Sequence, residues 1–215
     1  DSGIWIEADK ININIPKLGI NDNDFIRLSN LKLKGRHNHE NIIPAIAFGL
    51  IAGISKEKIV KTITEFTGLP HRIEFSGKIN TVEFYNDSKA TNVSAVLRAL
   101  EMFNGRKLVL ILGGSDKNLD FSPLLDPVRN SVAHLILIGE TAPKLEKVFS
   151  GKIAYSKADS MDEAVEKGYN FIKNDGVVLL SPACASFDWF SNYKERGEVF
   201  KKAVQNLRKK VGNEG

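Results

Sequence analysis

VVLLSPACASFDWFSNYKERG, residues 177–197, decides the fold of this chain because it joins an apolar strand to a loop of small and polar residues. Residues 177–180 are continuously apolar, as expected of a strand that a parallel sheet covers on both faces. Open α/β sheets bind ligands outside the carboxyl ends of their strands. We therefore expect a ligand-binding loop after residue 180, with Ser186, Phe187 and Tyr193 as candidate site residues.

Strand patterns alternate with helical patterns over most of the chain. Ser160 and Glu163 have the spacing of a capping box at the start of one helix. Strands that alternate with helices predict an α/β fold with a mostly parallel sheet and helices on both faces. The further strands are predicted at residues 82–86, 108–112, 135–138 and 152–155, and the helices at 93–103, near 123, and at 142–149, 160–173 and 193–208.

The first third of the chain has a different pattern. Short β segments lie between residues 4 and 33, and isoleucines alternate with asparagines over residues 11–15. Helices are predicted at residues 41–52 and 56–66, and Pro44 fits the first of them only in its first turn. Because a strand pattern is already present at residue 4, we expect the chain to begin within a domain.

Gly68 and Pro70 interrupt the pattern between these two parts. A chain of 215 residues is long enough for one large domain or two smaller ones. We predict two, residues 1–68 and residues 69–215.

The composition is that of an ordinary globular protein, with 42% apolar and 26% charged residues. No apolar run is long enough to span a bilayer and no secretory signal is present, so we expect a cytoplasmic protein without a membrane partner. The net charge of +4 suits an anionic ligand but is too small to indicate nucleic acid. Cys184 is the only cysteine, which excludes an intrachain disulfide framework.

A second polar loop follows the predicted strand at residues 82–86. Lys89 and Thr91 are expected at a helix N-terminus, where unpaired backbone amides favour phosphate or carboxylate. A capped helix with a surface lysine explains the same residues equally well.

A third polar loop follows the strand at residues 108–112. Gly113 and Gly114 permit a tight turn and the close approach of a ligand, and Lys117 adds a positive charge at the same sheet edge. The segment lacks the glycine, lysine and hydroxyl spacing of a P-loop. Three polar loops at the ends of three strands indicate a binding site more strongly than any one of them.

Other candidates have more than one interpretation. Arg72 suits bidentate phosphate binding or a salt bridge between domains. Asn38 and Asn41 are suited to read an adenine edge or to cap a turn. Cys184 is more typical of a packed thiol than of a nucleophile. The four histidines have no metal-ligand spacing, so we predict no metal site in this chain.

Five strings, in their order along the chain, resemble the motifs of the Mur ligases, ATP-dependent enzymes of peptidoglycan synthesis. The resemblance covers residues 35–207, and NDSKATN and SPACASFD are its most specific parts. It implies that residues 1–68 are the C-terminal part of a central ATP-binding domain and that residues 69–215 are a Rossmann-like domain that binds the incoming amino acid. The strings are GRHNHEN at residues 35–41, GLPHRIE at 68–74, NDSKATN at 86–92, LGGSDKNLDF at 112–121 and SPACASFDWFSNYKERG at 181–197.

The resemblance also implies roles for individual residues. Lys89 would touch phosphate or substrate and is the candidate catalytic residue. ATP would be bound by Asn38 and Asn41 at the adenine, Arg72 at the phosphates and Asp87 at the ribose. D-glutamate would be bound by Thr91, Lys117, Ser186, Phe187 and Tyr193.

The implied reaction joins D-glutamate to UDP-N-acetylmuramoyl-L-alanine through an acyl phosphate, with ATP and magnesium. The P-loop, the magnesium ligands and the uridine-binding domain of the family are not found in this sequence. We therefore expect the isolated chain to be inactive and to need the missing segments of the same protein. A Mur-type ligase for another amino acid, or a non-catalytic nucleotide or amino-acid binding module, stays open as an alternative.

Overall fold

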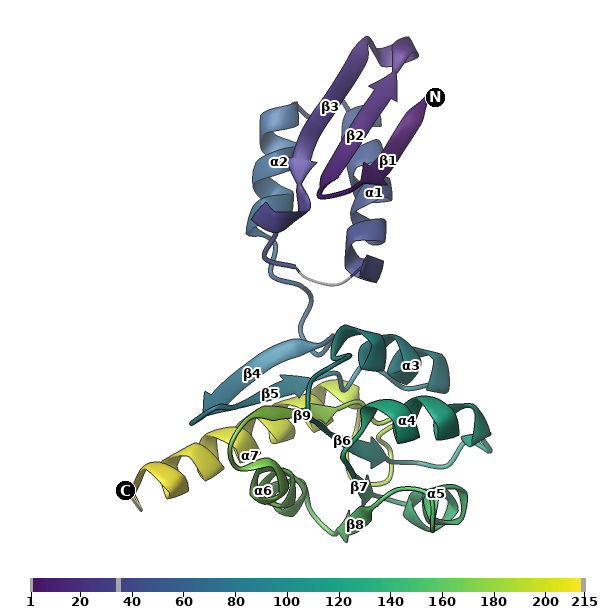
Figure 1. Ribbon diagram of the computed structural model, residues 1–215, viewed down its shortest axis with the longest axis vertical. Coiled ribbons are helices and arrows are strands. Elements are labelled where there is room, and N and C mark those ends of the chain that lie inside the picture. Colours follow the sequence, from purple (N-terminus) through teal and green to yellow (C-terminus); the bar gives the residue numbers. More distant parts are fainter. Residues whose placement is uncertain (1, 34–35, 214–215) are drawn as a thin grey trace. The chain divides into compact units, whose positions relative to one another are not determined.

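The computed structural model describes residues 2–33 and 36–213 (Figure 1). The chain folds as two compact units, Asp1–Gly68 and Leu69–Gly215. The division coincides with the break in the sequence pattern at Gly68. In the described residues, no helix combines the length and the apolar character needed to cross a membrane.

The N-terminal unit is a three-stranded antiparallel sheet with two helices. Its strands pair in the order β1-β2-β3, and α1 packs against β1 and α2. Its core consists of Ile11, Ile13, Phe25, Ile26, Leu31, Ile42, Ile46 and Ile59. The elements are β1 (Gly3–Glu7), β2 (Lys10–Ile15), η1 (Pro16–Leu18), β3 (Ile20–Arg27), η2 (Leu28–Asn30), α1 (Arg36–Ile51) and α2 (Lys56–Glu65).

Helix α1 begins earlier than its sequence pattern predicts. It starts at Arg36 rather than at residue 41, so Pro44 lies inside the helix and not in its first turn. A proline there removes one backbone hydrogen bond. The burial of Ile42 and Ile46 on the same helix offsets that loss, which is a tertiary effect that the local pattern does not contain.

The C-terminal unit contains a six-stranded sheet in the order β4-β5-β9-β6-β7-β8. Only the pairing of β4 with β5 is antiparallel, which confirms the predicted α/β fold with a mostly parallel sheet. The strands are β4 (Glu74–Ile79), β5 (Val82–Asn86), β6 (Leu108–Gly113), β7 (His134–Ile138), β8 (Tyr155–Ala158) and β9 (Gly176–Leu180).

The sequence pattern missed one of the two edge strands and misplaced the other. Strand β4 was not predicted, and β8 lies at Tyr155–Ala158 rather than at residues 152–155. Each of them buries a single residue fully, Ile79 in β4 and Ala158 in β8. Edge strands are open to solvent on one side, so their apolar signal is weak.

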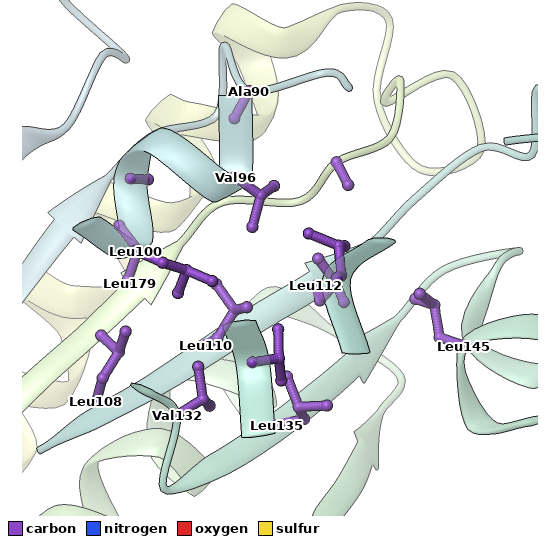
Figure 2. Close-up of a cluster of buried hydrophobic side chains, with 14 of the residues drawn as sticks. Ala90, Val96, Leu100, Leu108, Leu110, Leu112, Val132, Leu135, Leu145 and Leu179 are labelled. Atoms are coloured by element: carbon purple, nitrogen blue, oxygen red, sulfur yellow. The ribbon is translucent and has the colours of Figure 1, made fainter. Parts of the chain in front are cut away.

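Helices cover both faces of this sheet, and successive residues of β6 explain why. Leu108, Leu110 and Leu112 pack on the face covered by α3, α4 and α5 (Figure 2), whereas Val109 and Ile111 pack on the face covered by α6 and α7. The helices are α3 (Val93–Met102), the short η3 (Ser122–Leu124) with α4 (Leu125–Ser131), α5 (Ala142–Phe149), α6 (Met161–Ile172) and α7 (Tyr193–Asn213).

The capping box predicted for α6 is present. The Ser160 hydroxyl accepts a hydrogen bond from the Glu163 amide at 3.2 Å, and the Glu163 carboxylate accepts one from the Asp159 amide at 2.7 Å. α6 carries the chain from β8, at one edge, back to β9 in the middle of the sheet. This return places the carboxyl end of β9 between those of β5 and β6, where open α/β sheets bind ligands.

Candidate active site

Three loops leave the carboxyl ends of the adjacent strands β5, β9 and β6, and backbone hydrogen bonds join them. The Asp87 amide donates to the Leu180 carbonyl at 2.7 Å, which ties the β5 loop to the end of β9. The Ser115 amide donates to the Ala185 carbonyl at 3.0 Å, which ties the β6 loop to the β9 loop. The three polar segments predicted from sequence therefore form one continuous surface of the C-terminal unit.

Gly114 is required for the contact between the β6 and β9 loops. A Cβ atom at this position would lie 2.3 Å from the Ala185 carbonyl oxygen, and its φ of +149° disfavours other residues. The sequence predicted that a ligand approaches this glycine. The structure shows that the approaching group is the backbone of the β9 loop.

Asp87 follows β5 and is almost completely buried. Its carboxylate accepts hydrogen bonds from the Ser181 hydroxyl at 2.8 Å and from the Ile73 amide at 3.3 Å. Burial raises the pKa of Asp87 to about 7, although both hydrogen bonds and the charge of Arg72 favour the ionised form. Asp87 is therefore poised to change its protonation state near neutral pH.

Lys89 is held by two contacts. Its amide donates to the His71 carbonyl at 3.0 Å, and its Nζ lies 4.0 Å from the centroid of the Tyr193 ring. Thr91 is half-buried two residues further on. Helix α3 begins after its N-cap Asn92, whose side chain accepts from the Ala95 amide. Lys89 and Thr91 thus precede the helix N-terminus rather than stand within it.

Lys117 and Phe187 come together from the β6 and β9 loops. The Lys117 Nζ lies 5.6 Å from the centroid of the Phe187 ring, and the ring is 67% exposed. Ser186, the neighbour of Phe187, is buried. Asp188 accepts hydrogen bonds from the Ser115 hydroxyl at 3.5 Å and from the Glu140 amide at 3.1 Å, which links the loop after β7 to the same surface.

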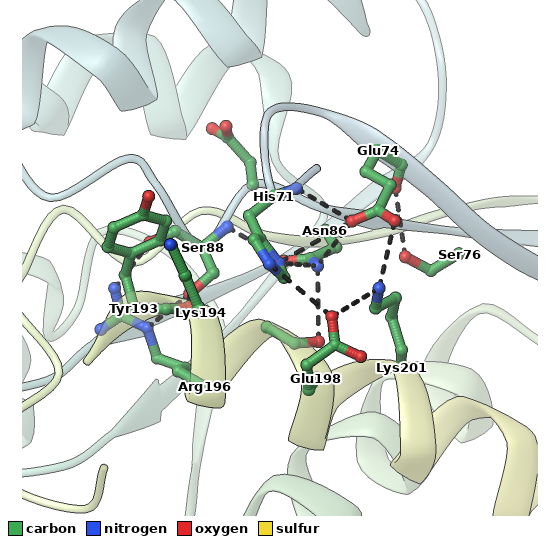
Figure 3. Close-up of polar contacts among 12 residues, drawn as sticks. His71, Glu74, Ser76, Asn86, Ser88, Tyr193, Lys194, Arg196, Glu198 and Lys201 are labelled. Atoms are coloured by element: carbon green, nitrogen blue, oxygen red, sulfur yellow. Dashed lines mark hydrogen bonds and ion pairs between the residues drawn. The ribbon is translucent and has the colours of Figure 1, made fainter. Parts of the chain in front are cut away.

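Arg196 is a site residue that the sequence reasoning missed. It lies on α7, is 1% exposed and donates hydrogen bonds to both the β5 and the β9 loops. Figure 3 shows it beside Ser88 of the β5 loop. The Ser88 hydroxyl and carbonyl accept at 2.9 and 2.8 Å, and the carbonyls of Cys184 and Ala185 accept at 3.0 Å each. Burial lowers the pKa of Arg196 to about 10, which leaves the guanidinium charged at neutral pH.

A signal for Arg196 was present in the sequence. Phe200, Ala203, Val204 and Leu207 form the buried stripe of α7, and residue 196 lies on that stripe, four positions before Phe200. A charged residue on the apolar stripe of a helix must find buried partners.

Of the remaining predicted residues, Arg72 affects the three loops described above through its charge, and Cys184 is packed within one of them. Arg72 is exposed in the segment before β4, and its charge reaches Asp87. Asn38 and Asn41 lie in α1 of the N-terminal unit. Cys184 is buried, its thiol lies 3.4 Å from the Thr141 hydroxyl, and burial raises its pKa to about 11. It is a packed thiol.

The chemistry of this surface favours an anionic ligand. The Lys89 ammonium lies over the Tyr193 ring and the Lys117 ammonium over the Phe187 ring, and the buried charge of Arg196 joins the β5 and β9 loops. Within residues 2–33 and 36–213, no three histidine, cysteine, aspartate or glutamate side chains are grouped so that they could hold a metal ion.

Comparison with known proteins decides the family. The profile of the family described as "Mur ligase, glutamate ligase domain" matches residues 71–184, just over half of the chain. The chain belongs to the Mur ligase family. The matched residues include the β5 and β6 loops and the first part of the β9 loop.

Sequence relatives within the Mur ligases carry a more specific name. The UDP-N-acetylmuramoylalanine–D-glutamate ligase of Coxiella burnetii (strain Dugway 5J108-111) is 44% identical over 183 residues, which are 84% of this chain and 41% of that protein. The ligase of the same name from Thermoanaerobacter sp. (strain X514) is 40% identical over 97% of this chain and 46% of that protein. The chain thus spans less than half the length of these relatives.

Solved structures share the fold at low sequence identity. MurF from Acinetobacter baumannii matches with a TM-score of 0.63 at 20% identity over 96% of this chain and 44% of its own. Folylpolyglutamate synthase from Thermotoga maritima matches with a TM-score of 0.65 at 15% identity over 94% of this chain and 46% of its own. At these identities the likeness shows the fold alone.

Replacing Arg196 tests whether it holds the loops together. Arg196→Met leaves the buried carbonyls of Ser88 and Cys184 without their donor, whereas the Ala185 carbonyl keeps the Ser115 amide. An unsatisfied buried group costs about 1 to 3 kcal/mol, so we expect the free energy of unfolding to fall by at least about 2 kcal/mol. Urea denaturation followed by circular dichroism measures the loss. Arg208→Met is the matched control, because Arg208 lies exposed on the same helix. Equal denaturation midpoints for the two variants would show that the buried contacts stabilise nothing.

Asp87 predicts a pH dependence of stability. Its pKa is about 7 in the folded protein and 3.8 when unperturbed, so the folded state binds the proton more tightly between these values. Stability from this group is complete below pH 3.8 and is lost as the pH rises through 7. One pKa unit corresponds to about 1.4 kcal/mol. We therefore expect Asp87→Asn to stabilise the protein at pH 8 by on the order of 1 to 4 kcal/mol.

The measurement for Asp87 is urea denaturation at pH 4.5 and at pH 8. The gain from Asp87→Asn should be present at pH 8 and much smaller at pH 4.5, where the wild-type carboxyl is protonated. Asp126→Asn serves as the control, since the Asp126 side chain is 71% exposed on α4. A gain from Asp87→Asn that is the same at both pH values contradicts the assignment.

Proposed function

We propose that the protein to which this chain belongs is an ATP-dependent ligase that joins D-glutamate to UDP-N-acetylmuramoyl-L-alanine in peptidoglycan synthesis in the cytoplasm. The observation that carries the proposal is the gathering of Lys89, Thr91, Lys117 and Ser186 at three adjacent strand ends. The two ligases from Coxiella burnetii and Thermoanaerobacter support it, because their name states this ligation and they are 44 and 40% identical to the chain.

In this proposal the C-terminal unit binds D-glutamate. Lys117, Ser186 and Thr91 hold its side-chain carboxylate, and the Phe187 and Tyr193 rings lie beside the two lysines. A lysine ammonium and two hydroxyls are suited to a carboxylate, because each donates a hydrogen bond to it. The buried charge of Arg196 favours the same anion without touching it.

ATP is assigned to both units of the chain. The N-terminal unit is the C-terminal part of an ATP-binding domain, with Asn38 and Asn41 at the adenine. In the C-terminal unit, Arg72 contacts the phosphates and Asp87 accepts hydrogen bonds from the ribose hydroxyls. Ribose hydroxyls favour the ionised form of Asp87, so nucleotide binding lowers its pKa from about 7. Magnesium enters only as the counterion of the phosphates.

The proposed reaction has two steps, phosphoryl transfer and then amide formation. The alanine carboxylate attacks the γ-phosphorus of ATP, and ADP leaves as an acyl phosphate forms. The amine of D-glutamate then attacks the acyl carbon, and inorganic phosphate leaves as the amide forms and the nitrogen loses a proton. The protein contributes mainly by positioning the reactants and neutralising charge. Lys89 is the residue expected to neutralise the transferred phosphoryl group.

Phosphate release by the complete protein tests the proposal. With ATP, magnesium and UDP-N-acetylmuramoyl-L-alanine, we expect release with D-glutamate and not with L-glutamate, lysine or diaminopimelate. Phosphate release with another amino acid would support the ligase chemistry but would overturn the assignment of D-glutamate as the substrate. The absence of release with every amino acid overturns the ligase itself and favours a binding module.

Lys117→Ala tests the carboxylate site. A charge-assisted hydrogen bond contributes about 1.5 to 3 kcal/mol, so we expect the KM for D-glutamate to rise roughly ten- to a hundredfold. The KM for ATP should change far less, because Lys117 is assigned to the amino acid alone. Lys202→Ala, an exposed position on α7, is the control. An unchanged KM for D-glutamate in Lys117→Ala contradicts the role.

A further inference from the structure

Asn86, at the end of β5, is completely buried and its amide can have only one orientation (Figure 3). Its Oδ1 accepts a hydrogen bond from the Ser88 amide at 3.1 Å. Its Nδ2 faces the Glu74 carboxylate at 3.1 Å and the Gly197 carbonyl at 3.4 Å, which are both acceptors. Turning the amide over would place an NH₂ group against the Ser88 N–H and an oxygen against two oxygens, so the orientation in the structure is the favourable one.

This orientation determines which nitrogen of His71 carries the proton. The His71 Nδ1 lies 3.0 Å from the Asn86 Nδ2. The amide NH₂ has two hydrogens, and its contacts with the His71 Nδ1 and the Glu74 carboxylate, at 3.0 and 3.1 Å, are shorter than its contact with the Gly197 carbonyl at 3.4 Å. Because the NH₂ can only donate, Nδ1 accepts one of the two hydrogens, and His71 is the neutral tautomer with hydrogen on Nε2. The direction of each hydrogen bond from Ser88 through Asn86 to His71 is thus set by the chemistry of the groups.

The surroundings of His71 keep it neutral. Burial is the main cause that lowers its pKa, Lys201 and Lys194 on α7 lower it further, and Glu74 and Glu198 oppose them. The two carboxylates lie 3.8 and 3.6 Å from the ring nitrogens. Lys201 pairs with both carboxylates, at 3.2 and 2.7 Å, which weakens their pull on a proton at His71.

The imidazole has no room to move away from Asn86. A Cβ on Gly197 would lie 2.3 Å from the His71 Nδ1 and 2.9 Å from the Asn86 Nδ2, so the backbone of α7 is in contact with both groups. The Tyr193 ring meets the imidazole edge-on, with the ring centroids 6.0 Å apart. A proton added at Nδ1 would point at the Asn86 NH₂, and the available response is rotation of the amide.

We propose that His71 and Asn86 are positioning residues for the loop at residues 87–91, and that they hold this loop only while His71 is neutral. The importance of the loop for catalysis rests on the proposed function. Rotation of the Asn86 amide removes the acceptor of the Ser88 N–H. The Arg196 guanidinium also donates hydrogen bonds to the carbonyl and the hydroxyl of Ser88. The Lys89 amide donates to the His71 carbonyl. Protonation of His71 therefore removes one of the hydrogen bonds that hold the backbone between Asp87 and Lys89, while the bonds from Arg196 and from the His71 carbonyl remain.

Nuclear magnetic resonance of this chain, labelled with ¹⁵N and ¹³C, tests the proposal without any substrate. We expect His71, assigned by its loss in His71→Gln, to carry its proton on Nε2 at pH 8. Its titration midpoint should lie below the ordinary histidine value of about 6.5, and the Ser88 amide resonance should shift with the same midpoint. A proton on Nδ1, or a Ser88 amide that does not follow the titration of His71, overturns the proposal.

Asn86→Asp reverses the polarity of the contact. The carboxylate still accepts from the Ser88 amide, but its second oxygen now faces Nδ1 and also the Glu74 carboxylate. Both negative charges favour a proton on Nδ1, so the proton should move there and the midpoint of His71 should rise by at least one pH unit. Asn92→Asp is the matched control, because aspartate caps helix α3 as well as asparagine does. A His71 midpoint that is the same in Asn86→Asp and in Asn92→Asp overturns the proposal.

The complete protein supplies a second readout. Its KM for ATP should rise on acidification, because Asp87 and His71 both become protonated. In His71→Gln, the part of this rise that follows the titration midpoint of His71 should be absent. If the KM for ATP rises in the same way on acidification in His71→Gln and in the wild type, the positioning role is overturned. A protein that shows the expected His71 and Ser88 titrations but no ligase activity would instead overturn the proposed function and leave the hydrogen-bond chain intact.

Discussion

The burial of the Arg196 guanidinium is the interaction on which the site depends. A charge removed from water is costly unless hydrogen bonds replace the lost solvation. In the part of the chain that the structure describes, its partners are one hydroxyl and three carbonyls, and none is a carboxylate. The charge is thus solvated by the backbone of two loops, which must stay together to do so. This single group links the β5 loop, the β9 loop and helix α7.

The topology of the sheet explains why these loops meet. β9 is the last strand in the chain but lies between β5 and β6, because α6 crosses the sheet on the face opposite α3, α4 and α5. Polar segments that are about 30 and 65 residues apart in sequence consequently leave one sheet at neighbouring strand ends. Gly114 then lets two of the loops approach at backbone distance.

Folding stability and ligand binding favour different protonation states of the buried groups at this surface. Asp87 is buried and therefore destabilises the fold when it is ionised, whereas the ribose that we propose for this position would favour the ionised form. His71 must stay neutral for Asn86 to keep its orientation, and it does so among two carboxylates and two ammonium groups. Such conflicts are typical of sites that hold polar groups in place for a ligand.

The sequence by itself determined the alternation of strands and helices, the break at Gly68 and the three polar loops, because each depends on local periodicity or on turn residues. It also contained the motifs that resemble the Mur ligases. Local patterns did not reveal β4 and placed β8 too early in the chain, because the exposed edges of these strands carry little apolar signal. They also did not reveal the early start of α1. The partners of Arg196 and Asn86 were decided only by tertiary structure. These residues act through contacts as long as 111 positions in sequence, and a hydrogen-bond partner at that separation is set by the packing of α7 on the sheet.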